Sequence, residues 1–302
     1  MTRRSTSLTS LSIFFGALLA CDAAPESTPA DDAPAEQNEP PTAEEPAPAP
    51  EEEAAEEPEE VDCEPAPTVP PRVMFVLDKS NSMTGGGSES GATDDGSPTR
   101  WAQLHALVGE IVAGLEAGAQ TGAVLFPSSY AETSDALCHV RSVPEAALGP
   151  YRAAELLKRL PPAHAQGFRG GSPAQAAYAT ALDHLESTGA SGPTAIVLIT
   201  DGGLNCASEE SPLGAPDREF AELVAFARDS LQIQTFVIGV GVAPGEQKVP
   251  FVDPDAALRE IALAGGAAHG ERGYFTTADA QPLATALSTL VDRADAGTPA
   301  CE

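Results

Sequence analysis

Four short runs of apolar residues stand out along the chain, and each is followed closely by polar or glycine residues. They cover residues 73–77, 123–126, 195–199 and 236–238, the last continuing to Val240. A short apolar run without alternation is typical of a strand buried on both faces, as in a parallel sheet. We therefore expect four buried strands in the part of the chain that follows residue 72.

Between and after these runs, apolar residues recur at the spacing of a helix. The four patterns are Leu104, Leu107, Ile111 and Leu115; Tyr178, Leu182 and Leu185; Phe220, Leu223 and Ala227; and Leu283, Leu287, Leu290 and Val291. Spacings of three and four residues predict amphipathic helices. Strands that alternate with helices predict an α/β fold with a doubly wound, mostly parallel central sheet flanked by helices, all in one domain.

The first twenty residues have the pattern of an export signal. Arg3 and Arg4 precede an apolar stretch over 8–20, which is too short to span a bilayer and ends directly before Cys21. The sequence Leu18-Leu19-Ala20-Cys21 resembles a bacterial lipobox, which implies a lipoprotein signal peptide over 1–20 and lipid modification of Cys21. An ordinary secretory signal that happens to contain a cysteine is the alternative.

Residues 21–71 have a different composition, rich in Ala, Glu and Pro. Between Asp22 and Glu64 there are 17 acidic residues and no basic ones, and residues 22–71 hold 13 of the 28 prolines. Such a segment cannot bury enough apolar surface to fold, and its like charges repel one another. We expect a disordered acidic tether that holds the following domain away from the membrane.

The charge of the chain excludes some classes of partner. The formal net charge is −29, from 16 Lys and Arg against 45 Asp and Glu. A nucleic-acid-binding protein needs a basic surface, so no nucleic-acid partner is expected. Electrostatic docking on anionic lipid is disfavoured for the same reason, and the expected membrane contact is the lipid anchor alone.

Polar side chains follow two of the predicted strands. Asp78, Ser80 and Ser82 come after the first strand, and Asp201 follows the strand over 195–199. Ser172 precedes a predicted helix. Because the carboxyl ends of parallel strands meet at one edge of a sheet, we expect these residues to lie together. Carboxylate and hydroxyl oxygens with few charges suit Mg²⁺ or Mn²⁺.

Together these segments resemble a known site. Asp78-x-Ser80-x-Ser82, Gly170-Gly171-Ser172-Pro173 and Thr200-Asp201-Gly202 are similar to the metal-ion-dependent adhesion site of the von Willebrand factor type A domain. The resemblance implies such a domain over 72–298, with Ser80, Ser82 and Ser172 bound directly to the metal. Asp78 and Asp201 would act directly or through water. The family usually has Thr in the third segment, and Ser172 keeps the hydroxyl.

Structural roles are the alternative for these residues. Ser172, followed by Pro173 and Gln175, has the pattern of a helix N-cap with a capping box. Asp78 and Ser80 could shape a turn or cap the next helix. The polar loop over 84–100 follows the first motif and is a candidate specificity loop, and Asp94 and Asp95 within it are a weaker candidate for a further cation site.

The remaining cysteines predict disulfides. If Cys21 carries lipid, Cys63, Cys138, Cys206 and Cys301 remain, and four cysteines in an exported protein allow three pairings. Cys63 precedes the first strand and Cys301 follows the last helix, which places both at the amino edge of the sheet. Cys138 and Cys206 both follow strands and belong to the opposite edge. We therefore expect Cys63–Cys301 and Cys138–Cys206.

These observations favour a binding module over an enzyme. The expected function is a lipid-anchored, extracytoplasmic module of the cell envelope that engages an Asp or Glu carboxylate of a protein ligand through the metal. The alternatives are a metal-dependent hydrolase or phosphatase, and a structural subunit of an envelope complex. A hydrolytic metal site usually has a general base. The three motifs contain no histidine, and we expect His105 and His184 to be packing residues.

Overall fold

The structure is a computed structural model. It describes residues 70–85, 93, 96–115, 119–128, 137–189, 192–207, 219–243, 245 and 253–295, without the side chains of 290–295. The predicted signal peptide, Cys21, the Cys63–Cys301 pair, Asp94 and Asp95 lie outside the described residues. The same is true of the acidic tether except for its last two residues, Pro70 and Pro71. None of the described helices is long and apolar enough to cross a membrane.

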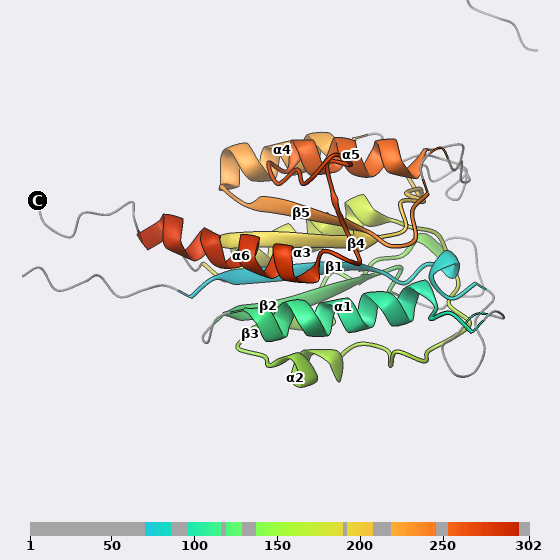
Figure 1. Cartoon of the computed structure of the whole chain (residues 1–302). Coiled ribbons are helices and arrows are strands. Elements are labelled where there is room, and N and C mark those ends of the chain that lie inside the picture. Colours follow the sequence, from blue (N-terminus) through green and yellow to red (C-terminus); the bar gives the residue numbers. More distant parts are fainter. Residues whose placement is uncertain are drawn as a thin grey trace, which may run out of the picture. The chain divides into compact units, whose positions relative to one another are not determined.

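The described strands form one sheet of six. In chain order they are β1 (Arg72–Asp78), β2 (Gln120–Phe126), β3 (Ala146–Gly149), β4 (Thr194–Thr200), β5 (Gln234–Gly239) and β6 (Phe275–Thr276). Their order across the sheet is β3-β2-β1-β4-β5-β6. All neighbouring pairs are parallel except β2 and β3, which are antiparallel. The predicted mostly parallel sheet is therefore confirmed (Figure 1).

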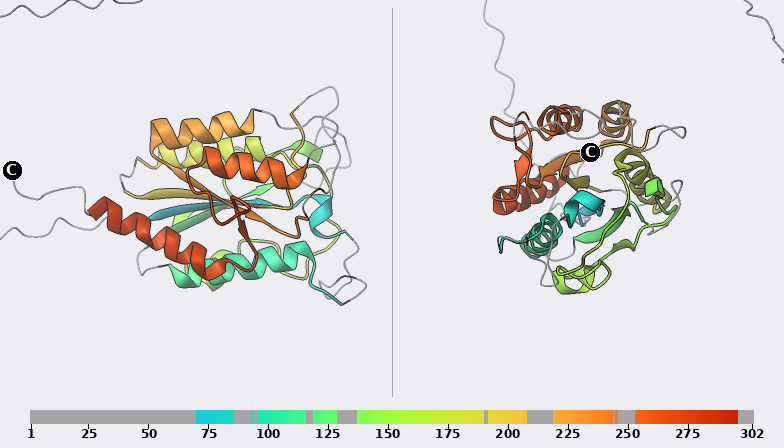
Figure 2. Two further views of the ribbon diagram at one scale, coloured as in Figure 1. Left: turned by 45° about the horizontal axis from the view of Figure 1, so that its top comes forward. Right: turned by 90° about the vertical axis from the view of Figure 1, so that its right-hand side faces the viewer.

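Helices cover both faces of this sheet. They are the short 3₁₀ helix η1 (Asn81–Met83) and the α-helices α1 (Arg100–Gly114), α2 (Ala153–Leu157), α3 (Ala174–Ser187), α4 (Phe220–Leu231), α5 (Pro254–Ala264) and α6 (Ala280–Asp295). One apolar core joins the sheet to α1, α2 and α6, and a second joins it to α3, α4 and α5. Figure 2 shows the resulting three layers.

The central strand β1 shows why the five residues between its charged ends, Arg72 and Asp78, are all apolar. All seven of its residues are buried. Val73, Phe75 and Leu77 belong to the core with α1, whereas Met74 and Val76 belong to the core with α3. Because successive side chains of a strand point to opposite faces, the interior of a strand covered on both sides is apolar at every position.

The four predicted helices are present, with two corrections at their apolar positions. α1 ends at Gly114, so Leu115 is its C-cap and not part of the helix. In α4 the fully buried residues are Phe220, Val224 and Ala227, while Leu223 is only partly buried. The first and last predicted positions of α4 are thus confirmed, and the middle one is Val224 instead of Leu223.

Candidate metal site

The five predicted site residues lie at the carboxyl edge of the sheet, where β1 and β4 end. Asp78 is the last residue of β1, and Asp201 directly follows β4. Ser80 and Ser82 lie in the turn and short 3₁₀ helix after β1, and Ser172 lies just before α3. All are buried except Ser82, which is partly exposed. The right-hand view of Figure 2 looks onto this edge, with η1 near its centre.

Asp78 is held inside the protein by both carboxylate oxygens. The Ser80 N–H donates to Oδ1 at 2.8 Å, and the Thr200 hydroxyl donates to Oδ2 at 2.5 Å. Burial raises the pKa of Asp78 to about 7, and the nearby Asp201 carboxylate adds to the rise despite these hydrogen bonds. A cation at this edge would lower that pKa again, because it stabilises the ionised carboxylate.

Ser80 and Ser82 present their hydroxyls side by side. The two Oγ atoms are 3.1 Å apart. Neighbouring ligands of an octahedral Mg²⁺ with bonds of about 2.1 Å are roughly 3 Å apart, so this spacing fits two adjacent coordination positions. The hydroxyl pair therefore passes a geometric test for the metal that the resemblance implies.

Ser172 lies next to the start of α3 and forms two hydrogen bonds with Asn205. α3 begins at Ala174 with Pro173 as its N-cap, one position later than the Ser172 N-cap predicted as an alternative. The Ser172 N–H donates to Asn205 Oδ1 at 2.7 Å, and the Asn205 N–H donates to the Ser172 carbonyl at 3.2 Å.

The segment before Ser172 contacts the first motif. The Asn81 N–H donates to the Gly170 carbonyl at 3.3 Å, which joins the turn after β1 to the loop before α3. Gly170 has φ +108°, and a side chain there would meet the Leu137 carbonyl at 2.6 Å. The glycine at this position is therefore required by both its backbone conformation and its close packing.

A disulfide stabilises the same loop. Cys138 and Cys206 are bonded, as predicted from the topology. The residue before each cysteine binds the loop of Ser172, because the Leu137 carbonyl accepts from the Gly171 N–H at 3.0 Å and Asn205 pairs with Ser172. We call this arrangement the Ser172 clamp: Leu137, Asn205 and the Cys138–Cys206 bond.

Asp201 is paired with a residue that the sequence reasoning missed. Arg100 Nη1 lies 2.9 Å from Asp201 Oδ2, and the Asp201 side chain is fully buried. Thr200 was recognised only as part of its motif, although its hydroxyl binds Asp78 directly. The sequence held one signal for each residue. Thr200 is a polar residue at the end of a buried strand, and Arg100 is a basic residue at the start of a helix that follows a polar loop.

The donor set as a whole is poor in charge. Among the described residues, no group of three or more His, Cys, Asp and Glu side chains is placed to hold a metal. The candidate site offers two carboxylates and three serine hydroxyls, which are hard oxygen donors. Such a set fits Mg²⁺ or Mn²⁺ and would leave part of the coordination shell to outside ligands.

The histidines predicted to pack do so. His105 lies edge-on to Trp101 with ring centroids 6.3 Å apart, and His184 Nε2 accepts from the Leu148 N–H at 3.0 Å. Lys79 is buried, and its Nζ lies 5.3 Å from the centroid of the Phe168 ring, in the core next to α1.

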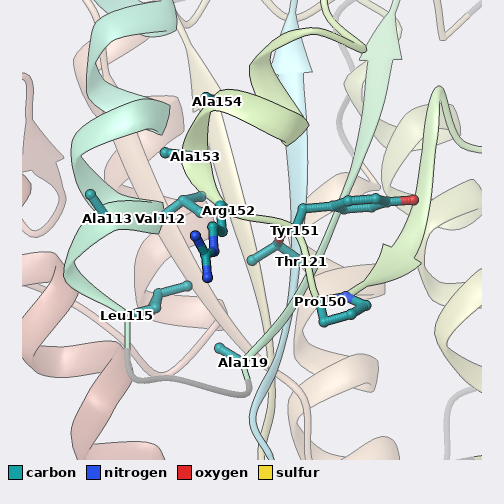
Figure 3. Close-up of a pocket in the computed structure, with 10 residues that line it drawn as sticks. All are labelled: Val112, Ala113, Leu115, Ala119, Thr121, Pro150, Tyr151, Arg152, Ala153 and Ala154. Atoms are coloured by element: carbon teal, nitrogen blue, oxygen red, sulfur yellow. The ribbon is translucent and has the colours of Figure 1, made fainter.

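A pocket of about 540 Å³ lies at the amino edge of the sheet, where β2 begins, opposite the carboxyl edge that carries the candidate metal site. Its walls come from the end of α1, the start of β2 and the segment before α2, and the Arg152 side chain extends into it (Figure 3). It contains neither a carboxylate nor a histidine among its lining residues. The candidate metal site is therefore separate from this pocket.

Comparison with known families gives one match, which covers part of the chain. Residues 73–203 match the model of the von Willebrand factor type A domain. The matched segment begins in β1 and ends just after Asp201, so it includes all five predicted site residues. A comparison with curated proteins gave no match.

Several solved structures are similar to this chain. An aerotolerance-related membrane protein from Bacteroides fragilis is 21% identical over 74% of this chain and 98% of its own, with a TM-score of 0.45. The von Willebrand factor domain of the type V pili tip protein Mfa5 from Porphyromonas gingivalis is 14% identical over 77% of this chain and 97% of its own, with a TM-score of 0.42. The PilB minor pilin from Streptococcus sanguinis is 14% identical over 77% of this chain and 64% of its own, with a TM-score of 0.46.

Proposed function

We propose that residues 72–298 form a von Willebrand factor type A module that binds a protein ligand through a divalent cation, Mg²⁺ or Mn²⁺. The observation that carries the proposal is the pair of Ser80 and Ser82 hydroxyls, 3.1 Å apart at the edge where Asp78 and Asp201 are buried. The two hydroxyls share a hydrogen bond, and their spacing also suits two adjacent ligands of an octahedral ion.

Each residue has a distinct part in this proposal. Ser80, Ser82 and Ser172 would bind the ion through their hydroxyls. Asp78 holds the turn after β1 through the Ser80 N–H and adds negative charge behind the hydroxyls. Asp201 supplies the second negative charge. The bound ion would offer an open coordination position to an Asp or Glu carboxylate of the ligand.

We also propose that the module is held in the cell envelope by lipid on Cys21, with residues 21–71 as the tether. The Cys138–Cys206 disulfide supports an extracytoplasmic location, because structural disulfides persist in oxidising compartments and are rare in the cytosol. The lipobox-like sequence and the acidic spacer come from the sequence alone.

Binding is favoured over hydrolysis by the composition of the site. A hydrolytic metal centre needs a base that activates water, and such a base is a histidine or a further carboxylate in most cases. Among the described residues, His105 and His184 take part in packing contacts instead. A structural subunit of an envelope complex would use the same face, and the second experiment below separates it from cation-dependent binding.

The first test is titration of Mg²⁺ into the full chain carrying Cys21→Ser, measured by calorimetry. Asp201→Ala should abolish measurable Mg²⁺ binding while circular dichroism shows an intact fold, because it removes one of two charges that oppose the ion. Asp229→Ala is the matched control, since Asp229 is an exposed carboxylate at the end of α4. Equal Mg²⁺ affinity in the folded parent, Asp201→Ala and Asp229→Ala proteins would refute the metal site and would mean that the motifs only shape turns.

The second test is capture of partners from envelope extract with Mg²⁺ or with chelator. Cation-dependent binding predicts a partner that is retained with Mg²⁺ and lost both with chelator and with Asp201→Ala. Retention that is equal under all conditions would instead support the structural-subunit alternative.

A further inference from the structure

Arg100 reaches the candidate site from the first turn of α1. Its Nη1 lies 2.9 Å from Asp201 Oδ2 and 3.4 Å from the Ser82 carbonyl, and its Nη2 lies 3.4 Å from the Gly241 carbonyl. The guanidinium thus joins the segments that follow β1, β4 and β5. Its side chain is 30% exposed, whereas that of Asp201 is 0% exposed.

The space for this guanidinium depends on a glycine. Gly241 has φ +61°, and a Cβ at that position would lie 2.9 Å from Arg100 Nε. A side chain there would therefore press on the arginine and displace it. Arg100 therefore packs closely against the backbone of Gly241, and we call this contact its cradle.

Charge explains why a cation is needed here. Asp78 and Asp201 are both fully buried, so two carboxylates lie close together away from solvent. Arg100 puts a fixed positive charge against Asp201. A buried carboxylate next to a guanidinium is strongly favoured over one left alone, because removal of one partner leaves an uncompensated charge.

We propose that Arg100 is a built-in counter-cation that competes with the divalent ion for Asp201. In the metal-free protein it neutralises Asp201 and links the three loops. When an ion binds, the same carboxylate has to serve two cations, so the guanidinium must withdraw or share it. Arg100 therefore lowers the affinity of the site for Mg²⁺ and stabilises the metal-free form. This inference rests on the proposed function.

The test compares Mg²⁺ binding and thermal unfolding in the full chain carrying Cys21→Ser. Arg100→Gln should tighten Mg²⁺ binding about tenfold, because repulsion and competition at Asp201 are removed. The same variant should unfold at a lower temperature in chelator and gain more from added Mg²⁺ than the parent protein. Arg228→Gln is the matched control, since it makes the same charge change in an exposed pair with Asp229, and both its readouts should equal those of the parent.

A second variant covers the case in which Arg100→Gln does not fold. Gly241→Ala leaves Arg100 in the sequence but displaces it from its cradle, so Mg²⁺ affinity should also rise. If folded Arg100→Gln and Gly241→Ala bind Mg²⁺ no more tightly than the parent, the competition is refuted while the proposed metal site stands. If Mg²⁺ binds to the variants but not to the parent, Arg100 blocks the site and the metal-dependent function of the parent is wrong. If no folded protein binds Mg²⁺, both proposals fail.

Discussion

Thr200 connects two parts of the candidate site through a single hydroxyl group. Its Oγ1 donates to Asp78 Oδ2 at 2.5 Å and accepts from the Gly202 N–H at 3.1 Å. It therefore fixes one carboxylate and, at the same time, the turn that carries Asp201. Residues that hold metal ligands from behind contribute to affinity without touching the ion.

Replacement of this hydroxyl by a methyl group should weaken metal binding. Thr200→Val keeps the branched shape that suits a strand, but it leaves Asp78 Oδ2 and the Gly202 N–H without their shared partner. We expect the Kd for Mg²⁺ to rise about tenfold and the free energy of unfolding to fall by about 1–3 kcal/mol. Calorimetry and chemical denaturation measure the two effects.

Thr121→Val is the control for that substitution. Thr121 is a buried strand residue, and within the described part of the structure its Oγ1 makes no hydrogen bond. The change should therefore leave Mg²⁺ affinity unaltered and should not destabilise the protein. A loss of Mg²⁺ affinity in Thr121→Val equal to that in Thr200→Val would point to a general effect on the sheet.

Long-range pairing explains which site residues the sequence could reveal. Asp78, Ser80 and Ser82 are recognisable because they directly follow a buried strand. The role of Thr200 depends on Asp78, 122 residues earlier, and that of Arg100 depends on Asp201, 101 residues later. No local pattern encodes such a contact, since it arises only when the strand order brings the two segments to the same edge.

At the level of elements, strands in the middle of the sheet were predictable and those at its edges were not. β1 and β4 are covered on both faces, so the interior of each, over 73–77 and 195–199, is a continuous apolar run. β3 has one buried residue, Ala146, and β6 has only two residues. Such short, partly exposed strands have no distinctive pattern.

The helix α5 was also missed, although its start had a signal. Asp253 precedes Pro254, and its side chain accepts hydrogen bonds from the Asp255 and Ala256 N–H groups. An N-cap aspartate followed by proline at the first helical position is a typical helix start. The apolar residues alone, Leu258 and Ile261, were too few to establish the period.

The contact between α3 and the edge strand β3 should depend on pH. His184 Nε2 accepts from the Leu148 N–H, and burial lowers the pKa of His184 below its ordinary value. The unfolded state therefore takes up the proton first. The stability from neutral His184 is complete above about pH 6.5 and is lost as the pH falls through the lower, folded-state value.

Denaturation midpoints between pH 5 and 8 test this contact. Wild type should lose stability on acidification more steeply than His184→Gln, whose amide oxygen accepts the same hydrogen bond without titrating. His164→Gln, at an exposed position, should keep the wild-type slope. Parallel curves for wild type and His184→Gln would contradict the predicted role of His184.

The Ser172 clamp should link the disulfide to metal binding. Cys138→Ala with Cys206→Ala should lower the free energy of unfolding by about 2–4 kcal/mol. It should also weaken Mg²⁺ binding, because the residues next to both cysteines hold the loop of Ser172. Asn205→Ala keeps the disulfide but removes the hydrogen bond to the Ser172 N–H, so it should weaken Mg²⁺ binding with a smaller loss of stability. Unchanged Mg²⁺ affinity in both variants would contradict the link to metal binding and would mean that the disulfide only stabilises the fold.

At the scale of the whole molecule, the predicted lipid anchor determines where the module works. Cys21→Ser should give a protein that enters the aqueous phase of a detergent separation, whereas wild type from membranes should enter the detergent phase. The difference follows from the loss of the acyl chains. A Cys21→Ser protein that still enters the detergent phase would exclude the lipobox interpretation.

The short outer strands of the sheet restrict how this module can join others. Many proteins associate by adding a strand from one chain to an open sheet edge of another, and peptides can be captured in the same way. Here one edge is β3, four residues long with an irregular register to β2, and the other is β6, with two residues. Among the described residues, neither edge offers a row of free backbone groups long enough to template a further strand. Even at high local concentration these modules should therefore resist edge-to-edge polymerisation, and contacts between them should be made by side chains.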